Sequence, residues 1–435
     1  MRRTIARTAC ATLLLLTQGL QAQVPAAAPA PPIDPVALAA RVQQDVEAIR
    51  GLPFKHSIPL QKQSPEEFGD HLDKEMVTAV PEAVSEHFGK IVRRLGLYRG
   101  PEITDFRGMM RTVMTSQAAA YYDPAEKRIY ILSGTGDELE LGLIYAHELY
   151  HGMQDQYFDL EAYLPQDSKL DGDRLLARQA VVEGEATYIH SLWAVRKMLN
   201  TMPSRELMAP AIRMQADMTI DQLRGVVGES AKEAMAQIDD IPPFILETLL
   251  GNYLKGAAFI FAVQEQGWPA VETLFKAYPP QSTEQILHPE KWLAHEGPAT
   301  IVWPDFARVP ALRDWELLDD DVVGEIQWRI IFNAQGLQDE AESAAAGWDG
   351  DRYAVFKRKG SDETLLLLRT SWDSEAEATQ FVTAYRRALA VKYEGASDPV
   401  RMEQQGADVF IVEGGRKADL DALIKVVRQA KKTHG

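Results

Sequence analysis

The sequence predicts a mostly helical α+β protein that ends in a smaller α+β module. Three observations support this fold class. Apolar residues recur at helical spacing through most of residues 37–304, a single hairpin pattern interrupts them, and strand and helix patterns alternate after residue 304. A chain of 435 residues can form two or three domains. We therefore expect a helical domain over residues 37–304 and a second domain, of unknown role, over residues 305–435.

The N-terminus has the pattern of an export signal. Arg2, Arg3 and Arg7 precede an apolar run at residues 9–16, and Gln21-Ala22 offers a cleavage point. The apolar run is too short to span a bilayer. We expect a signal peptide over residues 1–22 and an exported protein, periplasmic or extracellular, with no integral membrane segment after cleavage.

The cysteine count limits the chemistry of the mature chain. Cys10 is the only cysteine, and it lies inside the predicted signal peptide. The mature chain therefore has no disulfide, and any metal must be held by histidine and carboxylate side chains. Residues 23–36 are rich in Pro and Ala and poor in large apolar residues, which is typical of an extended linker.

The first part of the helical domain leads into a hairpin. Apolar spacing and stop signals predict helices at residues 36–51, 65–77 and 81–95. Residues 120–132 read as a strand, an Asp-Pro turn and a second strand. The edge strand of such a hairpin can hold an extended peptide by main-chain hydrogen bonds.

The next predicted helix, residues 138–156, contains His147-Glu-Leu-Tyr-His151, an H-E-x-x-H motif. Residues four positions apart on a helix project from the same face. Two imidazoles at this spacing can share one tetrahedral Zn²⁺, with Glu148 placed to take a proton from bound water. Uncharged neighbours such as Leu149 and Tyr150 indicate a buried helix.

A zinc site needs a third ligand beyond the two histidines. Glu183, within Val182-Glu-Gly-Glu-Ala186 on a long predicted helix at residues 174–199, is the candidate, and the alternative is a solvated carboxylate. Glu185 lies about 200° around that helix, so both glutamates cannot face one metal. Asp155 is a rival on the first helix, but it lies about 12 Å from His147 along the axis. We expect Asp155 to orient His151 or to be a surface carboxylate.

These motifs resemble those of the gluzincin metallopeptidases, without identifying a particular family. In gluzincins, H-E-x-x-H is followed on a later helix by a glutamate ligand, often within an E-G-x-A string. The resemblance covers roughly residues 121–287 and is specific at four positions. It implies a zincin-like domain with one Zn²⁺ per chain held by His147, His151 and Glu183, and with Glu148 as the general base.

Gluzincins commonly supply a Tyr or His to stabilise the oxyanion of the tetrahedral intermediate. His190 lies seven residues after Glu183 on the same helix face, but about 10 Å further along the axis. Tyr253 lies on a predicted helix at residues 242–264. For both residues the alternative is a structural role in the core, and spacing alone does not select either.

The remaining patterns complete the two expected domains. Residues 201–239 are expected to be helical, and another helix is expected at residues 267–278. In the C-terminal module we expect helices at residues 319–333, 374–390 and 418–431, and strands at residues 352–358, 364–370 and 408–412.

Charge and motif together predict the function. The net charge of −17 argues against nucleic acid and an anionic membrane surface as partners. The predicted activity is zinc-dependent hydrolysis of a peptide or protein substrate. One alternative is a catalytically silent zincin-fold protein that acts as a binding or scaffold module, and another is a metal-free helical protein with a coincidental motif. The oligomeric state, the substrate preference and any processing of the linker are left open.

Overall fold

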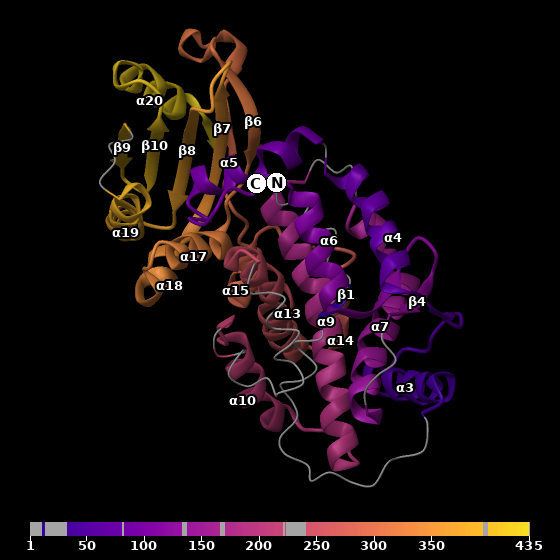
Figure 1. Ribbon diagram of the computed structural model, residues 1–435. Coiled ribbons are helices and arrows are strands. Elements are labelled where there is room, and N and C mark those ends of the chain that lie inside the picture. Colours follow the sequence, from indigo (N-terminus) through magenta and orange to yellow (C-terminus); the bar gives the residue numbers. More distant parts are fainter. Residues whose placement is uncertain are drawn as a thin grey trace.

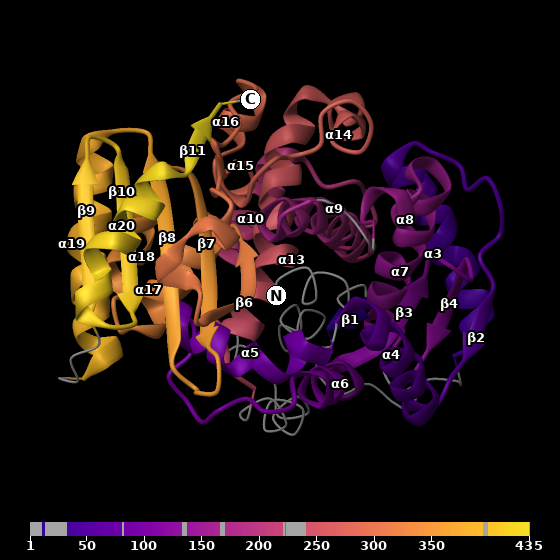
Figure 2. The same cartoon turned by 90° about the horizontal axis from the view of Figure 1, so that it is seen from above.

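The computed structural model describes residues 11–13, 33–80, 82–132, 137–165, 170–220, 222, 241–394 and 399–434. The predicted signal peptide and linker therefore lie outside the described residues, except for Ala11–Leu13 and the last few linker residues. Of residues 201–239, which were expected to be helical, residues 205–216 form a helix, and residues 221 and 223–239 lie outside the described residues. The protein is a mixed α+β structure with a helical part and a sheet part that lie side by side (Figures 1 and 2).

The helical part comprises most of the chain before residue 300. Its helices are α3 (Pro35–Arg50), α4 (Pro65–Ala79), α5 (Glu82–Leu95), α6 (Phe106–Gln117), α7 (Glu138–Phe158), α8 (Leu160–Tyr163), α9 (Gly172–Leu199), α10 (Arg205–Ala216), α13 (Pro243–Val263), α14 (Trp268–Thr273), α15 (Thr283–Leu287) and α16 (Pro289–Leu293). The helices expected at residues 36–51, 65–77, 81–95, 138–156 and 174–199 are confirmed, whereas α6 was not predicted. Apolar periodicity and caps identified these helices because their buried faces are continuous along the sequence.

Helices α9 and α13 form the centre of the helical part. They approach closely because glycines meet at the contact: a Cβ on Gly184 would lie 2.2 Å from the backbone carbon of Gly256. Residues Pro243–Gln266 are long and apolar enough to cross a membrane, but 83% of their most apolar window is buried inside the protein. Burial of this kind is also what a core helix of a globular protein shows.

A small sheet lies beside α7, with strand order β1-β3-β4-β2. Its strands are β1 (Ala11–Leu13), β2 (Leu60–Lys62), β3 (Ala118–Asp123) and β4 (Arg128–Ile131). Strands β3 and β4 pair in antiparallel fashion, from Ala120 opposite Ile131 to Asp123 opposite Arg128. The predicted hairpin is therefore confirmed, and Asp123 stabilises its turn by accepting hydrogen bonds from the next backbone N–H groups.

The sheet part is built on five antiparallel strands in the order β6-β7-β8-β10-β9. Its elements are β6 (Trp315–Asp321), α17 (Glu325–Ala334), α18 (Gln338–Ala345), β7 (Trp348–Arg358), β8 (Thr364–Trp372), α19 (Glu375–Tyr393), β9 (Val400–Gln405), β10 (Asp408–Gly414) and α20 (Leu420–Gln429). A separate pair joins β5 (Thr300–Val302) to β11 (Lys431–Thr433). One face of the five-stranded sheet packs on α20, and the other packs on α17, α19 and α5.

One predicted helix is partly wrong. Residues 319–321 belong to strand β6, and the helix begins only at Glu325. The aspartates of this stretch find partners outside it, because Asp319 accepts from Tyr353 and Asp320 from Arg352 across the β6–β7 ladder. Pairing with β7 therefore decides that residues 319–321 form a strand, and the local sequence pattern contains no information about this pairing.

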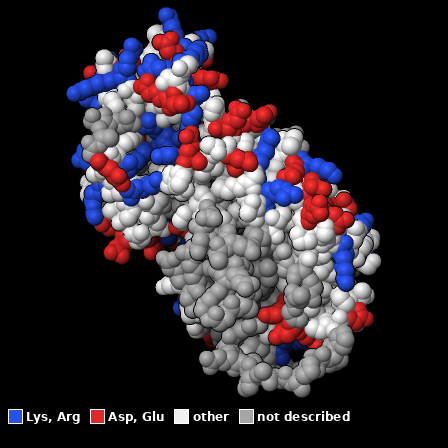
Figure 3. All heavy atoms as spheres, viewed as in Figure 1, with Lys and Arg blue, Asp and Glu red and all other residues white. Residues whose placement is uncertain are grey.

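The two parts share a core. One cluster of buried side chains extends from Phe68 in α4 through Phe88 in α5 to Ile411 in β10. The domain boundary at residue 304 therefore stays a prediction. On the face seen in Figure 3, Lys and Arg side chains gather mainly over the sheet part, and Asp and Glu side chains are scattered over both parts.

Candidate metal centre

Helix α7 carries the motif into the interior of the helical part. It begins with a capping box in which Asp137 accepts from the backbone N–H of Glu140 and the Glu140 carboxylate accepts from that of Asp137. From Leu141 to Asp155 every residue is buried. His147, Glu148 and His151 are each 0% exposed. Such burial is costly for ionisable groups unless they are paired or bind a metal.

Three side chains converge at the centre of the helical part. The Nε2 atoms of His147 and His151 lie 3.0 Å apart, and they lie 3.3 and 3.4 Å from Oε2 of Glu183. Glu183 comes from α9, as expected, and is fully buried. One ligand atom from each of the three residues lies within 4.8 Å of the other two. The structure therefore brings together the three side chains that the sequence singled out.

The chemistry of this cluster fits a metal ion. Two imidazoles and one carboxylate are a common donor set for zinc and other first-row divalent ions. The second carboxylate oxygen of Glu183, Oε1, is buried and has no hydrogen-bond partner among the residues that the structure describes. A metal ion between the three residues would bind their ligand atoms, which otherwise crowd one another. The cluster can therefore hold one metal ion.

Burial and mutual charge shift the pKa values of the three groups in the metal-free state. Burial lowers the pKa of His147 to about 4. Burial would also lower the pKa of His151, but the negative charge of Glu183 outweighs it and raises the pKa to about 9. Burial would raise the pKa of Glu183, but the neighbouring histidines lower it. Burial therefore opposes the charged form of all three groups, and the attraction between His151 and Glu183 offsets it for that pair.

Glu148 lies next to the cluster, at the β3 strand. Its Oε2 accepts a hydrogen bond of 2.7 Å from the backbone N–H of Tyr122. Because Tyr122 is in β3, this bond fixes the Glu148 carboxylate between α7 and the small sheet. Glu148 is therefore placed to act on a group that lies between the cluster and that strand.

The two candidate oxyanion residues both contact His147. The ring of Tyr253 stacks on the ring of His147 with centroids 5.8 Å apart. The Nδ1 atom of His190 lies 3.2 Å from Nδ1 of His147, on the side of the ring away from the cluster. Burial lowers the pKa of His190 well below its usual value, and the neighbouring histidines add to this effect. His190 is therefore a neutral group behind His147.

Both expectations for Asp155 are wrong, because its carboxylate does not bind His151 and Asp155 is buried rather than on the surface. Its carboxylate accepts from the Tyr122 hydroxyl at 2.6 Å and lies 2.8 Å from the amine of Lys127. The Nδ1 atom of His151 instead lies 2.9 Å from Oε1 of Gln154. On a helix, the residues at i+3 and i+4 both lie beside residue i, so Gln154 and Asp155 are both near His151. Tyr122 binds Asp155, and Gln154 is left to contact His151.

Glu185 points away from the cluster, as its angle around α9 requires. It accepts from Gln154 at 3.0 Å and from Arg50 at 3.2 Å. Sequence analysis singled out neither Gln154 nor Arg50. The i, i+3 spacing from His151 was a signal for Gln154, but Arg50 lies 135 positions from Glu185 and no local pattern indicates it.

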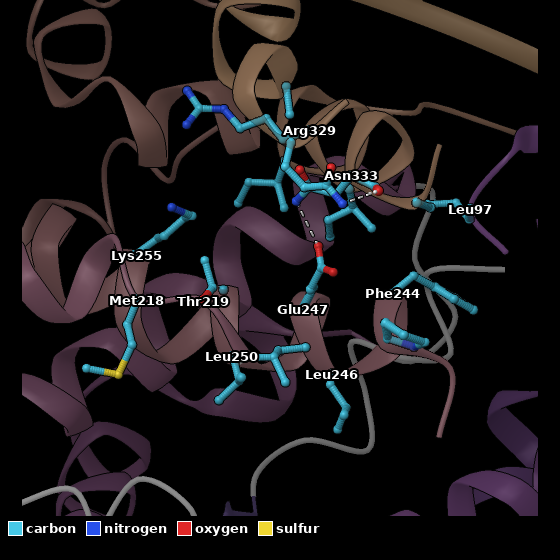
Figure 4. Close-up of a pocket in the computed structure, with 18 of the residues that line it drawn as sticks. Leu97, Met218, Thr219, Phe244, Leu246, Glu247, Leu250, Lys255, Arg329 and Asn333 are labelled. Atoms are coloured by element: carbon cyan, nitrogen blue, oxygen red, sulfur yellow. Dashed lines mark hydrogen bonds between the residues drawn. The ribbon is translucent and has the colours of Figure 1, made fainter. Parts of the chain in front are cut away.

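A separate cavity lies on another face of α13. Its volume is about 780 Å³, and it is lined by apolar side chains such as Phe244 and Leu250 and by charged ones such as Lys255 and Arg329 (Figure 4). Asn333 donates to Glu247 within it. No residue of the metal cluster lines this cavity.

Fold and site together define a mixed α+β protein with a buried centre that can hold one metal ion. Residues 315–424 match a family model described as a domain of unknown function, DUF8575. This match lies in the sheet part and does not include the metal cluster. No curated protein matches the chain.

One solved structure is similar over much of the chain. It is the crystal structure of a "putative hydrolase with a novel fold" from Chloroflexus aurantiacus, with 17% sequence identity. The similarity covers 67% of this chain and 97% of that chain, with a TM-score of 0.36. A TM-score of this size does not establish a shared fold. The gluzincin resemblance therefore rests on the motif residues alone.

Proposed function

We propose that this protein is a zinc-dependent hydrolase that cleaves peptide bonds. The observation that carries the proposal is the convergence of His147, His151 and Glu183, with the carboxylate of Glu148 fixed beside them at β3. Two histidines and a glutamate leave one tetrahedral position open, which is the arrangement of catalytic rather than structural zinc sites.

Each residue has a defined task in this proposal. His147, His151 and Glu183 would hold the ion, which, when bound, lowers the pKa of water and polarises a carbonyl group. Glu148 accepts the proton of the attacking water. The Tyr122 N–H donates to Oε2 of Glu148 and so holds the carboxylate beside the cluster. Tyr253, against the face of His147, remains the candidate for the oxyanion donor.

The edge of β3 away from β4 supports a peptide as the substrate, because an extended segment of the chain itself pairs with it. Strand β1 pairs with β3 in antiparallel fashion, with Ala11 opposite Tyr121 and Leu13 opposite Ala118. The edge of β3 away from β4 can therefore form main-chain hydrogen bonds with an extended segment. Because the same strand holds Glu148, a peptide bound there would have its main chain next to the general base.

Metal analysis tests the site. We expect purified wild-type protein to retain about one equivalent of zinc, and the His147→Ala variant to lose it because one of the three ligands is gone. Protein without stoichiometric zinc, or zinc retained by the variant, would contradict the metal centre.

Glu148→Gln tests the activity. This variant should still bind zinc, because Glu148 is not a ligand, and should cleave an unfolded protein about 100- to 10,000-fold more slowly than the wild type, because the general base is lost. If wild type and variant both bind zinc and are equally inactive on a broad peptide library, the protein is a binding or scaffold module and the enzyme proposal fails.

A further inference from the structure

The Gln154 side chain lies between a metal-binding histidine and a buried ion pair. Its Oε1 is 2.9 Å from Nδ1 of His151, and its Nε2 donates to the Val182 carbonyl and to the Glu185 carboxylate, both at 3.0 Å. Gln154 is 0% exposed. All the polar atoms of this amide therefore have a defined partner.

The direction of these hydrogen bonds is determined by their partners. The Val182 backbone carbonyl can only accept, so the atom that faces it must be the NH₂ group of Gln154. The amide oxygen must then face His151, and because it can only accept, Nδ1 of His151 must carry the hydrogen. The lone pair of the neutral ring is then on Nε2, which points at Glu183 and His147.

The ion pair behind Gln154 is fixed on several sides. Arg50 is 2% exposed, and its Nε donates to Glu185 at 3.2 Å and to the Tyr150 hydroxyl at 2.9 Å. The guanidinium lies over the ring of Trp268, 4.4 Å from its centroid. Arg50 therefore holds the Glu185 carboxylate where it faces the NH₂ group of Gln154. Arg50 is the last residue of α3, so the first helix of the described part reaches the surroundings of the cluster.

We propose that Gln154 is a positioning residue for the metal site, and that the Glu185–Arg50 ion pair fixes the orientation of its amide. In this arrangement His151 is held as the tautomer that presents Nε2 to the metal. The inference rests on the proposed metal site but is separate from any catalytic activity. It also assigns a role to Arg50, which lies 97 residues before His147 in the sequence.

Gln154→Leu removes the acceptor for His151 and keeps a buried side chain of similar size. We expect a loss of about 10- to 100-fold in Zn²⁺ affinity, measured by competition with a chelator, because the histidine ring is no longer held. Gln327→Leu is the matched control, because Gln327 is another buried helical glutamine, whose amide donates to Thr248 in a different part of the core. That control should bind Zn²⁺ like the wild type.

The double variant Gln154→Glu/Glu185→Gln gives a second test, because it exchanges the two side chains and keeps an acceptor for both His151 and Arg50. It reverses the hydrogen bond between positions 154 and 185 and removes the donor to the Val182 carbonyl. The introduced carboxylate can accept from His151, and the introduced amide can donate to it and accept from Arg50. Because the Val182 carbonyl loses its donor, we expect the double variant to recover only part of the wild-type Zn²⁺ affinity. Gln154→Glu alone should bind Zn²⁺ more weakly than the double variant, because two carboxylates then meet in the interior.

A nitrogen NMR readout separates positioning from folding. In zinc-loaded wild type, the His151 ring should show a hydrogen on Nδ1 and metal on Nε2, and Gln154→Leu should lose that single state. Equal Zn²⁺ affinity in wild type and Gln154→Leu, or a failure of the double variant to recover affinity while it folds normally, would overturn this inference. Absence of zinc from the wild type would overturn the metal site itself, so the two failures are distinguishable.

Discussion

Glu183 is the residue whose environment says most about the site. Its carboxylate is fully buried, one oxygen faces both histidines, and the other has no hydrogen-bond partner in the described part of the chain. Burying an anion in this way is unfavourable unless positive charge is close. The neighbouring histidines supply such an interaction, and the charge of Glu183 raises the pKa of His151 to about 9 although burial opposes it.

Replacing Glu183 should therefore affect metal binding more than replacing any residue behind the ligands. We expect Glu183→Ala to lower Zn²⁺ affinity by more than about 100-fold, because a direct ligand and its charge are both lost. Isothermal titration with Zn²⁺ measures this. Glu161→Gln, which changes a carboxylate on α8 that is more than half exposed, is the control and should leave the affinity unchanged. A Glu183→Ala variant with wild-type affinity would exclude this residue as a ligand.

At the scale of elements, the site depends on how closely α9 approaches its neighbours. Glu183 lies next to Gly184, and a Cβ on Gly256 of α13 would lie 2.1 Å from the Ala180 carbonyl oxygen. No substitution can fit there without moving one helix. The positions of Glu183 on α9 and of Tyr253 on α13, both of which contact His147, are therefore set by this glycine contact.

Gly256→Ala should destabilise the fold and disturb the metal centre. Overpacking of this kind costs about 1–3 kcal/mol, and the displaced helices should also weaken Zn²⁺ binding. Thermal unfolding and metal titration measure the two effects. Gly251→Ala on the same helix is the matched control, because a Cβ there meets no atom within 4 Å. Alanine at that position should leave Zn²⁺ binding unchanged and stabilise the helix by about 0.5–1 kcal/mol. Equal behaviour of the two variants would contradict the packing argument.

At the scale of the whole molecule, buried carboxylates join segments that lie apart in the sequence. Asp351 in β7 accepts from the backbone of Gly324 and from the indoles of Trp328 and Trp348. Asp173, at the start of α9, accepts from the backbone and the hydroxyl of Thr283 at 3.0 and 2.6 Å. These bonds join loops, helices and strands that are far apart in the sequence.

Asp173 should make the stability of the protein depend on pH. Burial raises the pKa of Asp173 to about 8, the Thr283 hydrogen bonds oppose this, and the charge of Asp171 adds to it. The unfolded chain then binds fewer protons than the folded one between about pH 4 and pH 8, so stability falls as the pH rises through this window. The stabilising contribution is complete below the unfolded pKa and is lost as the pH rises through the folded one.

The measurement is thermal unfolding at pH 5 and pH 8 for wild type and Asp173→Asn. The wild type should lose more stability between these two pH values than the variant, which cannot titrate at this position. Parallel changes in the two proteins would show that the Asp173 pKa is not raised in the folded state. The comparison between the proteins removes the contribution of other groups that titrate in the same range.

The sequence alone determined the local features. Caps, apolar periodicity and the Asp-Pro turn predicted most of the helices and the β3–β4 hairpin, because the signal for each lies within a few adjacent residues. Helix geometry alone places His147 and His151, which are four residues apart, on the same face of the helix. The separation of Glu183 from Glu185 around α9 follows from the same geometry.

Only the tertiary structure decided the contacts between distant segments. It assigned residues 319–321 to a strand, because β7 supplies the partner ladder. It gave Asp155 to Tyr122 and His151 to Gln154, and it brought Arg50 to Glu185. Some of these contacts are hydrogen bonds between residues dozens of positions apart. The others depend on which of two neighbouring residues on one helix makes the contact. A local pattern fixes which face a side chain is on, but only packing fixes what it meets there.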